Sequence, residues 1–298
     1  MKLLLISQFI FLISGSAYTH QCLTFPIHKE DFNFNWRAIE KHAPEAIVDK
    51  FIKDHPNDFE AYRHEDKNVF SLNIDSLHND HHFLDINGDG KDDVIFDGES
   101  SGEPRIIEIF INNGQSYKKV FSSMQGIVKL NWQAARLSEI FIRDWGCCDD
   151  YLEFHKIYGV KYDQKSMPTF QQVYQGVAIY SGYPSILPET VLDTPFRFEV
   201  LNQGYNVRIA PVKDDSSFQH WDNDGENNET KGSGNSLGRL AKGSKGIALA
   251  KSTDNTGRVW LYVEIDEEYL PKNNIIYIVD KFPTKLTGWI SDRFVMIL

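Results

Sequence analysis

The residues 85–93, DINGDGKDD, constrain the local fold of this chain more than any other segment. Oxygen-bearing side chains occupy its first, third, fifth and ninth positions: Asp85, Asn87, Asp89 and Asp93. Calcium takes about six to eight oxygen ligands, and short carboxylates and amides that alternate around a tight turn suit it. Gly90 at the sixth position permits the sharp turn, because glycine adopts a positive φ without a Cβ clash.

Lys91, at the seventh position of the segment, would contribute its backbone carbonyl while its side chain points outward. The sequence thus predicts a calcium site formed by the four side chains and this carbonyl. The alternative interpretation is an acidic surface turn that binds no ion. Neither interpretation identifies what the whole protein acts on.

The residues on both sides of this loop predict strands. An EF-hand requires a bidentate glutamate at position twelve and a helix on each side, whereas Phe96 stands at that position here. The flanks 82–84 and 94–96 are short runs rich in β-branched and aromatic residues, which is typical of strands. Downstream the pattern predicts a strand, a hairpin turn and a return strand: 105–111, 112–114 and 117–121.

The stretch from about 82 to 121 resembles an FG-GAP/VCBS-type repeat, the unit of integrin-like β-propellers. The matching residues are 83–90, Asp93 and 109–114. That family repeats the unit several times, whereas this chain has no second good copy. Because each repeat buries its faces against its neighbours, a single blade cannot close a propeller. The resemblance therefore implies a compact β-rich domain with one blade-like hairpin unit.

The first residues predict export. Lys2 precedes the mostly apolar run 3–13 and the small residues 15–17, which is the pattern of a secretory signal peptide. We expect residues 1–17 to be removed and the mature protein to be secreted or periplasmic. Nothing later approaches the ~20 apolar residues of a membrane helix. The formal net charge of −11 disfavours nucleic acid, which requires basic patches.

Export also bears on the three cysteines, because disulfides are expected in oxidising compartments. Cys22 could be the lipid-attachment site of a lipoprotein, but such a site has small residues directly before the cysteine. His20 and Gln21 stand there in this chain, which disfavours lipidation. A bond between the adjacent Cys147 and Cys148 would hold their Cα atoms at ~3.8 Å, closer than disulfides usually allow. A bridge from Cys22 to one of the pair and a strained vicinal disulfide both stay open.

Hydrophobic spacing predicts a short helical lead-in before the β-rich part. Between about 25 and 66, apolar residues recur at helix-like spacing, and Pro44 is expected to interrupt or restart the helix. The apolar residues at this spacing are Trp36, Ile39, Ala43, Ile47, Phe51 and Ile52.

The middle of the chain predicts antiparallel sheet. From about 69 to 175, short strand-like runs are separated by turn residues, among them 127–130, 138–142 and 152–158. Pro184, Pro188 and Pro195 then mark a connection. We therefore predict a mainly β chain with a β-rich domain at 18–190 and a second domain at 196–298.

Four landmarks follow one another in the C-terminal third: LNQGYNVRIAP at 201–211, SLGRLAKGS at 236–244, VWLYV at 259–263 and GWIS at 288–291. They resemble the bacterial SH3-like (SH3b) domain, whose usual segments are LNVRSGPS, IGTLKKGT, WYKV and GWVS. The resemblance implies an SH3-like β-barrel. The pattern alone also predicts strands, because Val207, Ile209, Leu261 and Val263 alternate as residues of one buried face should.

Two insertions depart from that family. The polar segment 214–235 contains 222–226, DNDGE, which echoes the calcium loop without its later ligands. The segment 270–286 contains IIYIV at 275–279, which predicts an added strand. These loops would border a ligand groove, so the family's specificity does not transfer directly.

Three other constellations have simpler explanations. His78, His81 and His82 could bind zinc with Asp80, but neighbouring residues of a strand point to opposite faces. Cys147 or Cys148 could act as a thiol nucleophile with His155, but the surrounding aspartates would raise the thiol pKa. Core packing is the simplest role for three of the tryptophans: Trp132, Trp145 and Trp260.

The sequence as a whole favours a secreted, non-catalytic binding protein. One domain would hold a structural calcium, and the SH3b module, by resemblance, would bind cell-wall or extracellular peptide or glycan. A thiol-dependent cell-wall hydrolase targeted by the SH3b module is the first alternative. An interaction protein of a surface or secretion assembly is the second.

Overall fold

The computed structural model describes residues 43–55, 78–99, 105–124, 126–145, 152–179, 187–216, 234–270 and 284–298. Several predictions concern segments outside these residues. They are the signal peptide at 1–17, the pairing and reactivity of Cys22, Cys147 and Cys148, the acidic stretch 222–226 and the added strand 275–279.

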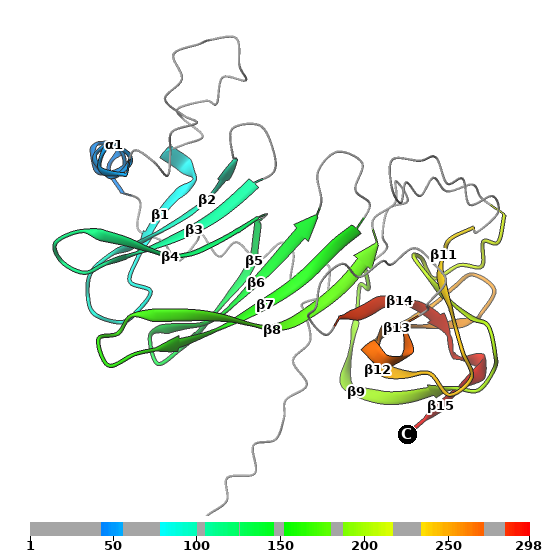
Figure 1. The fold of residues 1–298 in the computed structure, drawn as a ribbon. Helices are drawn as coiled ribbons and strands as arrows, with labels where there is room; N and C mark the ends of the chain where they lie inside the picture. Colours follow the sequence, from blue (N-terminus) through cyan, green and yellow to red (C-terminus); the bar gives the residue numbers. More distant parts are fainter. Residues whose placement is uncertain are drawn as a thin grey trace, which may run out of the picture.

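The described part of the chain is mainly β, as the sequence predicts (Figure 1). Its α-helix α1 spans Glu45–Asp54, and residues 78–79 are also helical. Its strands are β1 (His81–Leu84), β2 (Asp93–Glu99), β3 (Arg105–Asn112), β4 (Tyr117–Met124), β5 (Gly126–Gln133), β6 (Arg136–Trp145), β7 (Leu152–Tyr162), β8 (Pro168–Ile179), β9 (Val191–Val200), β10 (Tyr205–Arg208), β11 (Ser236–Leu240), β12 (Lys245–Thr253), β13 (Val259–Ile265), β14 (Lys285–Ser291) and β15 (Val295–Ile297). Within these residues no helix has the length and apolarity that crossing a membrane requires.

The helix α1 covers one face of the first sheet, whose antiparallel order is β1-β2-β3-β4. The helix begins directly after Pro44, the proline at which the sequence predicts an interruption or a restart of the helix. Its residues Val48 and Phe51 pack against Phe83, Phe96 and Phe110. The spacing placed Ile47 among the apolar helix positions, but Ile47 is 47 % exposed and Val48 fills the buried position.

The other face of the first sheet packs against the antiparallel strands β5 to β8 (Figure 1). Strand side chains alternate between the two faces, so Ile95 and Ile109 point away from α1 into this second core. The core is formed by Leu84, Ile86, Ile95, Ile107, Ile109, Ile111, Phe121, Leu130, Leu137, Ile140 and Ile142. The predicted strands of the middle segment are confirmed as β5, β6 and β7.

Each of the four C-terminal landmarks forms a strand, and these strands are β10, β11, β13 and β14. The four residues expected on one buried face, Val207, Ile209, Leu261 and Val263, all belong to a single hydrophobic core. Strand β9 pairs with both β12 and β15 and adds Phe198 and Val200 to that core. The pairings among the described strands do not close them into a barrel.

The two halves of the chain are joined through their sheets. Strand β8 pairs in parallel with β14, with Gly176 opposite Lys285 and Val177 opposite Leu286. The path of the larger sheet therefore runs β15-β9-β12-β13-β14-β8-β7-β6-β5, from the C-terminal strands into the middle of the chain.

Candidate metal centre

The predicted calcium loop connects β1 to β2, as the strand predictions for its flanks require (Figure 1). The strands pair with Leu84 opposite Asp93, so the loop closes where the ladder begins. Asp85 therefore follows directly after one strand, and Asp93 is the first residue of the next. The sheet fixes both ends of the motif.

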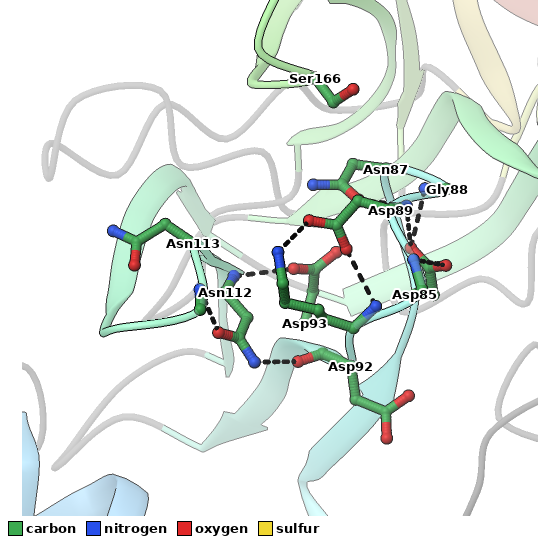
Figure 2. A network of polar contacts seen from close by, with 12 residues as sticks. Asp85, Asn87, Gly88, Asp89, Asp92, Asp93, Asn112, Asn113 and Ser166 are labelled. Carbon is green, nitrogen blue, oxygen red and sulfur yellow. Dashed lines mark hydrogen bonds and ion pairs between the residues drawn. The ribbon is translucent and has the colours of Figure 1, made fainter.

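The carboxylate of Asp85 organises the turn (Figure 2). Its Oδ1 accepts hydrogen bonds from the backbone N–H of Gly88 at 2.8 Å and of Asp89 at 3.1 Å. Its Oδ2 accepts the N–H of Gly90 at 2.8 Å. Gly90 has a φ of +85°, in the left-handed region that favours glycine, as the sequence predicts.

Asn87 and Asp89 continue the chain of turn contacts. Asn87 is buried, and its Oδ1 accepts the backbone N–H of Asp89 at 3.0 Å. Asp89 Oδ1 accepts the N–H of Lys91 at 2.9 Å, and Asp89 Oδ2 lies 2.9 Å from Lys91 Nζ. Partial burial raises the pKa of Asp89, but these bonds from Lys91 outweigh it and hold the pKa below its usual range. The Lys91 ammonium thus acts as a counter-ion at the position where a bound cation would be attracted.

Asp93 is fully buried, and both its oxygens bind backbone amides. Its Oδ2 accepts the N–H of Ile86 at 2.9 Å and its Oδ1 that of Asn112, at the end of β3, at 2.8 Å. Burial raises the pKa of Asp93, the two amide hydrogen bonds lower it, and the negative charges of Asp89 and Asp85 raise it. The net result is a pKa of about 6. When Asp93 is ionised, its negative charge is therefore not balanced by a neighbouring positive group among the residues that set its pKa.

The donor set fits calcium in its chemistry. A carboxylate oxygen that accepts one hydrogen bond keeps a lone pair, and the loop offers hard oxygen ligands only. Within the described residues, no group of three or more His, Cys, Asp or Glu side chains converges as a metal site. The loop carboxylates bind amide hydrogens and Lys91 instead, so ion binding would require Asp89 to turn away from Lys91.

The loop is also hydrogen-bonded to strands β6 and β7, a contact that the sequence motif did not predict. The carbonyl of Ile86 accepts the N–H of Leu137 at 2.9 Å, and the Tyr162 hydroxyl lies 3.0 Å from the same oxygen. Burial raises the pKa of Tyr162 to about 12, so its hydroxyl remains a donor. A Cβ at Gly88 would lie 3.1 Å from Cγ of Arg136, so glycine permits close packing there. The sequence could not predict this contact, because it is made by the backbone carbonyl of Ile86 and every residue has such a carbonyl.

Two of the histidines near β1, His78 and His81, contact α1 or the core beneath it. His78 Nε2 lies 2.8 Å from Oδ1 of Asp49 in α1, and the His81 ring lies against Phe96 with centroids 4.8 Å apart. Of the tryptophans expected in cores, Trp260 is buried and Trp132 is partly buried. The side chain of Trp145 lies outside the described part.

Comparisons of the chain with protein-family models, with curated proteins and with solved structures find no match. The prediction of a metal centre therefore rests on the residues of this loop alone.

Proposed function

We propose that this protein is a secreted, non-catalytic binding protein that one calcium ion stabilises. Asp85, Asn87, Asp89, Asp93 and the Lys91 carbonyl would hold the ion. The observation that carries the proposal is the fully buried carboxylate of Asp93. Its pKa is raised to about 6 by burial and by the charges of Asp89 and Asp85. A divalent cation would offset this accumulation of negative charge.

The structural role of the ion follows from where the loop lies. The loop contains Asp93, where the pairing of β1 with β2 begins, and Ile86, whose carbonyl accepts a hydrogen bond from Leu137 of β6. Calcium would therefore hold the β1–β2 turn and its contact with β5–β8 in one geometry. Extracellular calcium sites commonly bind with Kd of about 10⁻⁴–10⁻³ M.

The C-terminal strands would supply the binding activity as an SH3-like module with cell-wall or extracellular peptide or glycan as ligand. Supporting this proposal are the four landmarks on β10, β11, β13 and β14 and the single core beneath them. The net charge of −11 suits a secreted protein without nucleic-acid partners.

Retention on purified bacterial sacculi tests the ligand class. The full chain is the right reagent, because removal of 196–298 would strip β14 from β8 and expose a new sheet edge. We expect the folded protein to be retained on sacculi in the presence of calcium. The heat-unfolded chain should not be retained. Equal recovery of folded protein with sacculi and with an inert polysaccharide resin would contradict wall binding.

A further inference from the structure

A groove of about 550 Å³ crosses the face of β5–β8 that points away from the first sheet. Its centre is a cross-strand row in which Asn131 lies opposite Glu139, Glu139 opposite Gly159, and Gly159 opposite Gln171. The chain neighbours of these residues pack toward the first sheet, namely Leu130, Ile140, Tyr158 and Phe170. Because strand side chains alternate, the row itself points outward.

Gly159 lies at the centre of the groove, and the groove is deep there because glycine has no side chain. Its φ is not in the left-handed region, and the atom nearest to an added Cβ would be Val173 Cγ1, at an ordinary 3.4 Å. Neither backbone geometry nor crowding therefore requires glycine here, although glycine weakens a strand interior. A glycine inside a strand often marks a β-bulge or a place where a ligand approaches the backbone closely. The β7–β8 ladder shifts register between Ile157 and Tyr158, next to Gly159, and the exposed hollow beside Gly159 leaves room for a ligand as well.

The walls of the groove are polar and balanced in charge. Asn131 Nδ2 donates to Glu139 Oε2 at 2.8 Å on one side, and Lys161 Nζ donates to Gln171 Oε1 at 3.1 Å on the other. The negative and the positive group are each engaged by an amide, so neither sign dominates. Val173 adds apolar surface and is 45 % exposed.

We propose that this groove binds a short neutral oligosaccharide. Amide side chains offer both donors and acceptors, which suits paired hydroxyl groups, and Val173 suits the apolar C–H face of a sugar ring. The volume lies within the about 300–1,000 Å³ of known ligand pockets. The single Lys161 ammonium is balanced by the Glu139 carboxylate, so the walls offer no excess positive charge to a polyanion, and the net charge of −11 repels one. This site is separate from the calcium loop and from the C-terminal strands.

The substitution Gly159→Val tests the proposal, because valine favours strands and its Cβ would lie no closer than 4.0 Å to the backbone of the neighbouring strand. Thr169→Val is the matched control, since Thr169 is an exposed residue of the same strand pair, opposite Lys161 and outside the groove lining. The probes are neutral three- to six-unit oligosaccharides of glucose, mannose, galactose and N-acetylglucosamine, titrated by calorimetry. The Trp132 indole N–H resonance reports binding at the groove.

We expect at least one probe to bind the wild type and the Thr169→Val variant equally and to shift the Trp132 signal. Affinity should fall at least tenfold in Gly159→Val. Gln171→Ala, at an exposed position, should give a similar loss and serves if Gly159→Val fails to fold. Absence of binding by every probe, unchanged affinity in the groove variants, or preference for an uncharged peptide over all sugars would overturn the proposal.

Discussion

The three loop aspartates look alike in the motif but have different partners. Asp85 binds three amides of its own turn, and Asp89 binds Lys91 two positions further along. Asp93 binds the amide of Ile86 in the loop and the amide of Asn112 at the end of β3. Asp93 is thus part of the sheet as well as of the proposed site, so its removal would confound folding with ion binding. Asp89 is the better residue for a test, because its side chain contacts only the loop.

Asp89→Ala should abolish calcium binding, because the site loses an anionic ligand. Asp92→Ala is the matched control, since it removes the same charge from the same loop at an exposed position that is not a predicted ligand. Isothermal titration with calcium should show binding for wild type and Asp92→Ala only. Equal loss in both variants would mean that general loop charge, not coordination, attracts the ion.

Asp254 gives a pH dependence that is independent of the proposed metal centre. Hydrogen bonds from the Thr256 hydroxyl, then from Trp260 Nε1, hold the pKa of Asp254 well below its usual range. A lowered pKa stabilises the fold above the unfolded value of about 3.9, and this contribution disappears as pH falls through the folded pKa.

The substitution Asp254→Asn should therefore lower the free energy of unfolding at neutral pH. The gap between wild type and variant should narrow as the pH falls below about 4. Urea unfolding at several pH values measures it. A gap that stays constant down to pH 2 would show that the charge of Asp254 makes no difference.

At the scale of elements, the local pattern determined where strands and turns lie. Short apolar runs between turn residues predicted β2, β3 and β5–β7, and the Asn-Asn-Gly turn predicted the β3–β4 hairpin. Signals of this kind depend on neighbours in the chain, so one sequence suffices to detect them. The turn between β5 and β6 carries no such signal, because it consists of Ala134 and Ala135 at φ of 50° and 59°.

The Ala134–Ala135 turn should be improvable. Two residues at positive φ form the hairpin turn that favours Asn-Gly, and alanine is strained by about 1–2 kcal/mol per residue there. The double change Ala134→Asn/Ala135→Gly should raise the free energy of unfolding by about 1 kcal/mol. Gly257→Ala, at φ +79° in the β12–β13 turn, should lower it. Equal unfolding midpoints for all three proteins would contradict this explanation.

At the scale of the whole molecule, a buried polar cluster joins the two halves of the chain. Tyr174 of β8 donates its hydroxyl hydrogen to Glu264 of β13, and Lys285 Nζ of β14 lies 2.6 Å from the other oxygen of Glu264. Tyr174 and Glu264 are buried. The sequence could not reveal this cluster, because Tyr174 and Glu264 are separated by 90 positions and each is ordinary in its own strand.

Breaking this cluster should destabilise the whole chain. Removing one partner of a buried ion pair leaves the other charge uncompensated, which costs about 3–5 kcal/mol. Because the Lys285 side chain is 28 % exposed and stays partly hydrated, Glu264→Gln should lower the free energy of unfolding by less than this, about 1.5–3 kcal/mol, and uncouple the two halves in a calorimetric scan. Lys50→Met removes the exposed pair with Asp54 and should change little. Identical scans for Glu264→Gln and wild type would show that β8–β14 pairing alone holds the halves together.

The most direct test of the central claim is the melting temperature of the full chain in calcium and in chelator, with magnesium as a control cation. At about 100 times Kd, calcium should add about 2.7 kcal/mol, which corresponds to a rise of several degrees. We expect this rise for wild type and Asp92→Ala, and no rise for Asp89→Ala. Identical melting of wild type in calcium and in chelator would contradict the calcium site.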